Sequence, residues 1–376
     1  MKERNTTSWQ PTTLRNEDIE KFTSENTDVA VIDETAQNLE ELFLLRNPRF
    51  KFDKNYKKEL EVFNEAYRTK AFGNWFYFPW NNVLVRYFPE DIHNELRTGR
   101  NEYLITSEEQ NQFYYSTIVF LGMSVGSHIA LTVTMTGGSR HIKLADPDIL
   151  SGDNLNRIRL GFQHVGVSKA ILVARQIYEI NPYATIELYT DGINEINFGE
   201  LLKGVDLLVE ETDNPYWKLR ARELARERGI PVIMGTDNGD GAIVDIERFD
   251  VNKRLAILNG LIGKLTAGEL RTMKPSSLPK IAGKIAGTNL VVPRMLQSVS
   301  EVGKSLYSWP QLGTAATMCG SLGAYLARRI ILKDKRIKSG RYSINPDVTF
   351  ESGYKWRYFS RKKTFLKFIL EMSKRK

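Results

Sequence analysis

Cysteine is almost absent from this 376-residue sequence, in which Cys319 stands alone and histidine occurs only four times. One thiol excludes an internal disulfide, a cysteine-based zinc site and an iron–sulfur cluster, because each of these needs several cysteines. The first residues, MKERNTTSWQPTT, lack the apolar segment of a secretory signal. We therefore expect a protein of the reducing cytoplasm, without zinc.

A surplus of positive charge is missing from most of the chain, although the net charge is +8. From Arg336 onward 12 Lys and Arg stand against 3 Asp and Glu, a surplus of 9 that leaves residues 1–335 at −1. A nearly neutral body is not the positively charged groove that tracks a nucleic-acid backbone. We expect no nucleic-acid partner.

An uncharged run lies between Lys304 and Arg328, and its length is near that of a membrane-spanning helix. Pro310 and Gln311 interrupt the run, so we expect a buried helix that starts near Gln311. Its small residues Ala316, Gly320 and Ala324 would let another helix approach closely.

The basic tail mixes Lys and Arg with aromatic residues, which are Trp356, Tyr358, Phe359, Phe365 and Phe368. A short basic amphipathic helix at its end would suit an acidic partner or a membrane surface. We favour a packed terminal helix with a solvated basic face over contact with a membrane.

Short β-branched runs alternate with helical periods from Ser116 onward, which is typical of a doubly wound α/β domain. The expected strands are Thr117–Leu121, Ile142–Ala145, Thr185–Tyr189, Val205–Val209 and Pro231–Met234. The expected helices are His128–Thr136, Lys169–Ile180, Glu195–Leu202 and Trp217–Arg228. A hairpin signal, TDNGDG, follows at 236–241.

The fold class predicted is a Rossmann-like, mainly parallel sheet with helices on both faces, an α+β N-terminal region and a helical C-terminal part. The expected divisions are an accessory region over 1–95, the α/β domain over 96–250, a mainly helical extension over 251–335 and a basic aromatic tail over 336–376.

The first strand ends in the loop FLGMSVGS, which has two interpretations. Gly122-Met123-Ser124-Val125-Gly126 matches a G-x-S-x-G nucleophile elbow, but a hydrolase of that kind needs a late histidine and none follows His164. The loop also resembles a degenerate G-x-G-x-x-G phosphate loop with Ser124 and Ser127 at glycine positions. We favour the phosphate loop, followed by a helix whose amides attract negative charge.

Asp146 closes the next strand, where a carboxylate suits the hydroxyls of a ribose. A cluster of cations and amides then follows within about two dozen residues, too highly charged for an ordinary dinucleotide site. Its members are Asn154, Asn156, Arg157, Arg159 and Lys169. Such a cluster fits a triphosphate, whose charge shifts during transfer.

Asp213 follows the fourth strand, where an open α/β sheet presents groups to ligands. A lone carboxylate beside a triphosphate suits Mg²⁺, although a helix cap before Pro215 explains the residue equally well. Glu210 and Glu211 are neighbours without an assigned role. Asp237 and Asp240 are adequately explained by turn chemistry.

The order strand-GMSVGS-helix, LADPDILSGDNLNR, VGVSKA, INPYATIELY and EETDN resembles the ThiF/MoeB/HesA family, the bacterial relatives of ubiquitin-activating enzymes. The resemblance runs roughly from Arg97 to Asp250. It implies ATP·Mg²⁺ binding and AMP transfer to a carboxylate, usually the C-terminus of a ubiquitin-like protein or peptide, by a homodimer.

The resemblance assigns roles residue by residue. It makes Asp146 the ribose acid, Asn154 and Arg157 the phosphate-contacting N-x-x-R, Lys169 the phosphate lysine and Asp213 the metal aspartate. The loop residues Gly122, Ser124, Gly126 and Ser127 become the nucleotide cradle. Arg97 or Arg100 becomes the arginine that family dimers insert into the neighbouring site, and the sequence does not choose between them.

Three departures from the family pattern stand out. Serines replace two loop glycines, Ile158 replaces a polar glutamine after Arg157, and the paired C-x-x-C zinc motifs are missing. Cys319 lies in an apolar helical run, where a buried inert thiol is expected rather than a thioester-forming one. A catalytically silent binding protein and a nicotinamide oxidoreductase remain the alternatives.

Overall fold

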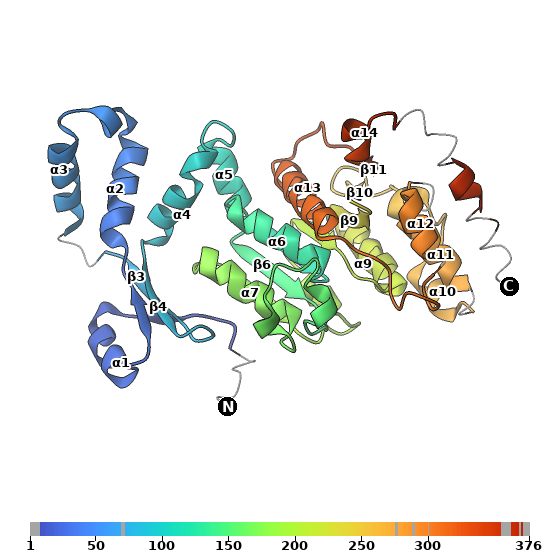
Figure 1. Ribbon diagram of the computed structural model, residues 1–376, viewed down its shortest axis with the longest axis horizontal. Helices are drawn as coiled ribbons and strands as arrows, with labels where there is room; N and C mark the ends of the chain where they lie inside the picture. Colours follow the sequence, from blue (N-terminus) through green and yellow to red (C-terminus); the bar gives the residue numbers. More distant parts are fainter. Residues whose placement is uncertain are drawn as a thin grey trace.

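A computed structural model describes residues 8–68, 72–274, 277–287, 290–299, 301–354, 362–367 and 370. The molecule is elongated, with the N-terminal region at one end, a central sheet and the later helices at the other end (Figure 1). Its seven-stranded central sheet and the helices around it confirm the predicted α/β class.

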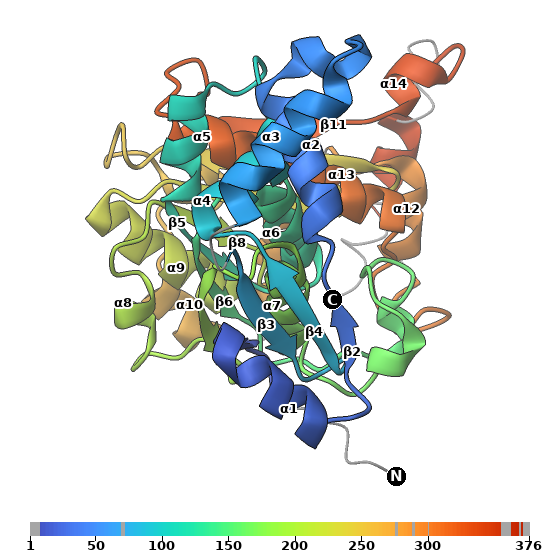
Figure 2. The ribbon, with the colours of Figure 1, turned by 90° about the vertical axis from the view of Figure 1, so that its left-hand side faces the viewer.

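The N-terminal region is α+β, as expected. Its four-stranded sheet has the order β1-β3-β4-β2 and faces the viewer in Figure 2. Its elements are β1 (Thr12–Leu14), α1 (Ile19–Glu25), β2 (Ala30–Ile32), α2 (Thr35–Arg46), α3 (Tyr56–Arg68), β3 (Asn74–Phe78), β4 (Val83–Tyr87) and α4 (Glu90–Thr98). The region docks on the central domain through Glu179, whose carboxylate accepts from Trp80 Nε1 at 2.6 Å and whose carbonyl accepts from Tyr87.

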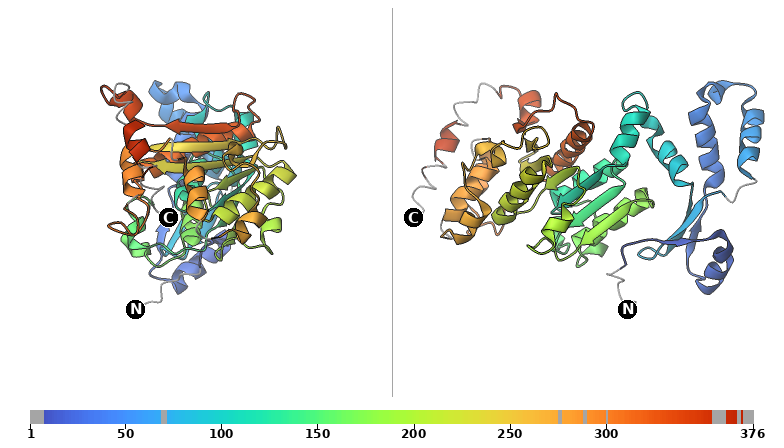
Figure 3. Two further views of the ribbon diagram at one scale, coloured as in Figure 1. Left: turned by 90° about the vertical axis from the view of Figure 1, so that its right-hand side faces the viewer. Right: turned by 180° about the vertical axis from the view of Figure 1, so that it is seen from behind.

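The central sheet has seven strands in the order β11-β10-β9-β8-β5-β6-β7. Five of them are parallel, and β10 and β11 add an antiparallel edge (Figure 3). The strands are β5 (Thr117–Leu121), β6 (His141–Ala145), β7 (Thr185–Tyr189), β8 (Leu207–Glu210), β9 (Val232–Asn238), β10 (Gly241–Glu247) and β11 (Gly340–Ile344). The predicted hairpin is present, because Asn238 pairs with Gly241 across a two-residue turn.

Helices cover both faces of this sheet. Ile118 and Phe120 of β5 pack into one apolar cluster with α6, α7 and α13, whereas Val119 and Leu121 pack into the other with α8, α9, α10 and α11. The helices are α5 (Ser107–Tyr114), α6 (Val125–Met135), α7 (Lys169–Ile180), α8 (Phe198–Leu201), α9 (Pro215–Arg228), α10 (Ala267–Thr272), α11 (Leu278–Ala286), α12 (Pro293–Val299), α13 (Gly313–Ile331) and α14 (Asp347–Phe350). Alternate residues of one buried strand thus serve two cores, as in a doubly wound fold.

The later part of the uncharged run lies in α13, which begins two residues after the predicted start at Gln311. A Cβ on Gly320 would lie 2.6 Å from the Cβ of His128 in α6, so the small residue is what lets the two helices touch. Within the ranges described, no helix is both long and apolar enough to cross a membrane.

The region predicted as a tail contributes β11 to the sheet, a role that its sequence did not indicate. β11 is an edge strand and its residues are half-buried or exposed, so it lacks the apolar run of a central strand. Residues 362–367 are helical, and Phe365 packs against an apolar cluster that contains Ile243 and Val291. The other aromatic tail residues, Trp356, Tyr358, Phe359 and Phe368, lie outside the described residues.

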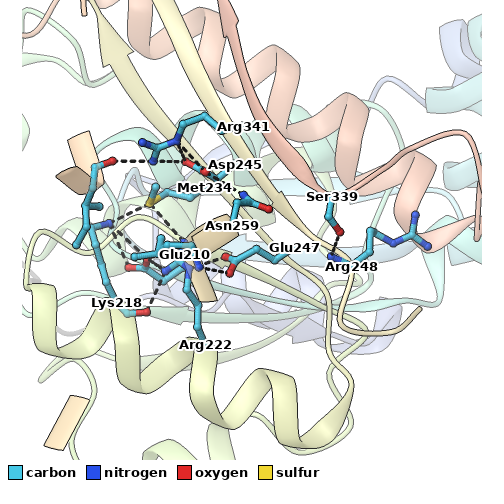
Figure 4. A network of polar contacts seen from close by, with 12 residues as sticks. Glu210, Lys218, Arg222, Met234, Asp245, Glu247, Arg248, Asn259, Ser339 and Arg341 are labelled. Carbon is cyan, nitrogen blue, oxygen red and sulfur yellow. Dashed lines mark hydrogen bonds and ion pairs between the residues drawn. The ribbon is translucent and has the colours of Figure 1, made fainter. Parts of the chain in front are cut away.

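Buried charges join the central strands to α9 and to β11 (Figure 4). Arg222 of α9 donates from Nε to Glu247 Oε2 at 2.6 Å and from Nη1 to Glu210. Burial alone would raise the pKa of Glu210, but Lys218 and Arg222 lower it to about 2. Arg341 of β11 holds Asp245 of β10 in the same way, at 2.6 Å.

Candidate active site

A cavity of about 1670 Å³ opens at the carboxyl ends of the parallel strands. β5 is the first strand of the sheet in chain order, and its neighbours β6 and β8 leave on opposite sides. That reversal is the switch point at which open α/β sheets bind ligands. The cavity lies where the sequence places its site.

The loop after β5 forms the floor of the cavity, with Gly122, Ser124 and Val125 in its wall. Gly122 has φ +87°, and a Cβ there would stand 2.6 Å from the carbonyl oxygen of Glu211, so no other residue fits. Ser127 instead donates to the carbonyl oxygen of Ser124 and is buried, and Gly126 packs toward the side chain of Glu211. Gly126 and Ser127 therefore support the conformation of the loop and do not line the cavity.

Asp146 lies beside this loop at the end of β6 and is only 4% exposed. Its Oδ2 accepts from the backbone N–H of Met123, and its Oδ1 accepts from that of Asp148 at 2.7 Å. Burial raises the pKa of this carboxyl, and the two backbone donors oppose the rise. The carboxylate is thus fixed in orientation and retains lone pairs for a ligand hydroxyl.

Asn154 and Arg157 enter the cavity from the segment after β6. The Asn154 side chain accepts from the Ser151 N–H at 3.3 Å and closes a short 3₁₀ turn, Gly152–Asn154. The Arg157 guanidinium reaches back to the phosphate loop, with Nε 3.4 Å from Ser124 Oγ. Its Nη1 also donates to the Asp153 carbonyl oxygen and to Asn156 Oδ1, and these hydrogen bonds hold the guanidinium beside the loop.

Lys169 is the first residue of α7, lines the cavity and is 8% exposed. Its ammonium lies 2.8 Å from Asp148 Oδ2, and that carboxylate is itself largely exposed. Lys169 and Arg157 therefore give one side of the cavity two cations that a polyanion would contact.

Asp213 lines the cavity beyond β8 and is exposed. Asp213 is not the N-cap of α9. The cap is Asn214, whose side chain accepts from the N–H groups of Tyr216 and Trp217. In the part of the chain that the structure describes, the Asp213 carboxylate has no hydrogen bond or ion pair. It is free to face a ligand.

Neither Arg97 nor Arg100 lines the cavity of its own chain. Arg97 is tied inward, since Nη1 donates to the carbonyl of Thr134 at 2.8 Å and the guanidinium lies over the ring of Tyr114. Arg100 is exposed. Of the two, only Arg100 has a side chain that is not tied to its own chain by a described contact.

Glu211 and Asp237 are carboxyl groups of the cavity wall to which the sequence analysis assigned no function. Glu211 Oε1 accepts from the Gly235 N–H at 2.6 Å, and burial raises the pKa of Glu211 well above its usual value. Asp237 lies within β9 and not in the turn, which consists of Gly239 and Asp240, so turn chemistry does not explain it. Only the pairing of β8 with β9 brings these groups together, and sequence spacing carries no sign of it.

Cys319 is fully buried in α13 and donates to Asp237 Oδ1 at 3.6 Å. Burial and the neighbouring carboxyl groups of Asp237 and Glu211 raise the pKa of the thiol far above its usual value. A thiol held neutral in this way is a poor nucleophile.

Magnesium is the metal that this donor set suits. Across the described ranges, no three His, Cys, Asp or Glu side chains are grouped as a metal cage. Mg²⁺ needs no such cage, since it commonly takes one or two carboxylates together with substrate phosphates and water. Asp213, a free carboxylate in a cavity that Arg157 and Lys169 also line, fits that pattern.

Two curated proteins are similar to this chain in sequence. An uncharacterised protein of Mycobacterium tuberculosis (strain CDC 1551 / Oshkosh), MT1398, is 33% identical over 277 residues, which are 74% of this chain and 38% of that one. A probable molybdopterin-synthase adenylyltransferase of Porphyra purpurea is 30% identical over 111 residues, 29% of each chain. The chain spans well under half the length of these relatives.

Among solved structures, the E. coli tRNA N6-threonylcarbamoyladenosine dehydratase TcdA has a TM-score of 0.48 at 20% identity, over 65% of this chain and 97% of that one. E. coli MccB has a TM-score of 0.45 at 15% identity, over 63% and 64%. The family model for ThiF matches residues 99–362, which include the whole cavity. This chain belongs to the ThiF family.

Proposed function

We propose that this protein is an ATP-dependent adenylyltransferase that activates a carboxylate and releases pyrophosphate. The observation that carries the proposal is the convergence of Asp146, Arg157, Lys169 and Asp213 on one cavity around the loop after β5. A dinucleotide oxidoreductase would leave Asp213 and the paired cations without a task. Relatives that include an adenylyltransferase support the same chemistry.

The reaction joins an oxygen of the acceptor carboxylate to the α-phosphorus and breaks the bond from that phosphorus to the oxygen that leaves with pyrophosphate. No covalent enzyme intermediate is needed, because positioning and charge stabilisation suffice. Asp146 would hold the ribose hydroxyls. Arg157 and Lys169 would balance the negative charge that moves toward the leaving group, aided by the amides at the start of α6.

Asp213 would hold the magnesium ion, which supplies charge neutralisation to the phosphates when bound. The acceptor we propose is the C-terminus of a peptide or a ubiquitin-like protein. E. coli MccB has been crystallised with MccA, and UBA4 of Eremothecium gossypii is described as an adenylyltransferase and sulfurtransferase. We also propose a homodimer in which Arg100 reaches the neighbouring site, and a cytoplasmic location.

Substitution of the charged groups tests the proposal. Arg157→Ala or Asp213→Ala should lower the adenylation rate about 10²–10³-fold, as for the loss of one preorganised charge stabiliser. The measurement is ATP–pyrophosphate exchange with N-acetylglycylglycine as the carboxylate. Arg159→Ala is the matched control, since Arg159 follows Arg157 closely but is not in the cavity wall.

Exchange at near-wild-type rates in both variants would contradict the assigned roles. A catalytically silent relative predicts no exchange and no ATP binding by the wild-type protein. An oxidoreductase predicts binding of NAD⁺ in place of ATP.

A further inference from the structure

Asp237 is the least satisfied polar group of the cavity wall. Its side chain is 5% exposed, and its Oδ2 has no hydrogen-bond partner among the described residues. Its Oδ1 receives the weak thiol donor of Cys319 at 3.6 Å, and the Gln311 side chain also lies against the carboxyl group. A buried carboxylate oxygen without a donor destabilises a fold, so its presence in a cavity indicates a ligand that supplies the donor.

The position of Asp237 separates it from the nucleotide side of the cavity. Asp146 directly follows β6, whereas Asp237 lies in β9, and β5 and β8 stand between those strands. Three strand spacings amount to about 14 Å. A nucleotide held by Asp146 and the loop after β5 therefore leaves the β9 side of the cavity to a second molecule.

The groups around Asp237 indicate which chemical groups that second molecule carries. Asp213 adds negative charge, and Arg157 is the cation that acts on Asp237. The amide of Gln311 also lies against it, and Trp309 and Gln311 help to line the same cavity. This corner attracts hydrogen-bond donors, and it lies beside the cations that attract phosphate.

We propose that Asp237 is a specificity-determining residue whose Oδ2 accepts a hydrogen bond from an N–H group of the acceptor, next to the carboxylate that is adenylated. The inference rests on the proposed function and deepens it. An N–H group one carbon away from a carboxylate belongs either to the last amide of a peptide or to the ammonium of a free amino acid. The cavity, larger than the 300–1,000 Å³ of a single small-molecule site, favours the peptide.

Matched probes isolate this hydrogen bond. N-acetylglycylglycine carries the N–H, and its ester analogue, with oxygen in place of the last N–H, differs by that donor alone. Free glycine represents the ammonium source. ATP–pyrophosphate exchange with each probe is measured for the wild type, for Asp237→Asn and for Asp240→Asn, the matched control in the same hairpin but outside this cavity.

We expect the wild type to favour the amide over the ester about tenfold or more in KM, the effect of one hydrogen bond to a charged group. Asp237→Asn should raise KM for the amide by that factor, leave kcat and the ester unchanged, and so abolish the preference. Asp240→Asn should behave as the wild type. Selective use of free glycine, lost in Asp237→Asn, would assign the same carboxylate to an ammonium and reject the peptide.

An amide preference that persists in Asp237→Asn would overturn the inference. So would wild-type protein that binds ATP but shows no exchange with any probe. Failure to bind ATP at all would instead contradict the proposed function, and titration calorimetry with ATP and magnesium separates that outcome from the others.

Discussion

The carboxyl group of Asp237 has a consequence for stability as well as for binding. Burial raises its pKa to about 6 from an ordinary 3.8, with Cys319 and Arg157 opposing the rise. The folded state therefore retains a proton that the unfolded chain has already lost between pH 4 and 6. Stability falls as the pH rises through that window, and above it the loss is about 3 kcal/mol.

Asp237→Asn should remove this loss. At pH 8 the variant should be more stable than the wild type by up to about 3 kcal/mol, and the difference should shrink toward pH 5. Urea unfolding at several pH values measures it, with Asp240→Asn as the control that shows no such trend. A variant less stable at pH 8 would mean that Asp237 is a structural residue.

Single residues differ in how far the sequence could reveal them. Asp146, Arg157, Lys169 and Asp213 follow strands or start helices in a recognisable order, and the structure brings all four to one cavity. Glu211 and Asp237 belong to the same cavity only because β8 and β9 pair, which no local pattern states. No local pattern in the sequence indicated that Gly126 and Ser127 do not line the cavity.

Helix α9 is held to the sheet by charge as well as by apolar packing. Arg222 is fully buried between Glu210 of β8 and Glu247 of β10. Removing it would leave two buried carboxylates without their shared cation. Arg222→Ala should therefore lower the free energy of unfolding by about 3–5 kcal/mol.

Arg226→Ala, on the same helix but only half-buried, is the control for Arg222→Ala and should change stability far less. Chemical denaturation of the two variants provides the comparison. Equal losses of unfolding free energy in the two variants would show that the buried ion pairs of Arg222 do not stabilise the fold.

The contact between α6 and α13 depends on the absence of a side chain at Gly320. A Cβ there would stand 2.6 Å from His128 Cβ and 3.0 Å from its carbonyl, and backbone does not give way cheaply. Gly320→Val should destabilise the fold by about 1–3 kcal/mol or more. The same change at exposed Ser321 should have little effect, and similar melting temperatures for the two variants would rule out close helix packing there.

Elements were predictable where their periodicity is strong. α7 has the predicted bounds, and β5 and β7 do too. α6 begins at Val125, three residues before its predicted start, because the small residues of the loop conceal the first turn. β11 escaped prediction because an edge strand with exposed residues carries no apolar run.

On the scale of the whole molecule, the sequence predicted the α/β class and the switch-point cavity, but not how far regions remote in sequence contribute to it. α11 and residues near Trp309 line a cavity whose other walls come from residues 121–237. In the described ranges, no residue before β5 lines it, so the N-terminal region is attached to the domain without forming the site. Such long-range closure is set by packing between distant segments.

A triphosphate in this cavity is the central claim, and unfolding in the presence of nucleotide tests it most directly. A ligand that binds only the folded state raises the apparent stability, by about 2.7 kcal/mol at a hundredfold excess over its Kd. ATP with magnesium should raise the melting temperature of the wild type and of Arg159→Ala, and raise those of Arg157→Ala and Lys169→Ala far less. Stabilisation by NAD⁺ and none by ATP, or an equal ATP effect in all four proteins, would contradict it.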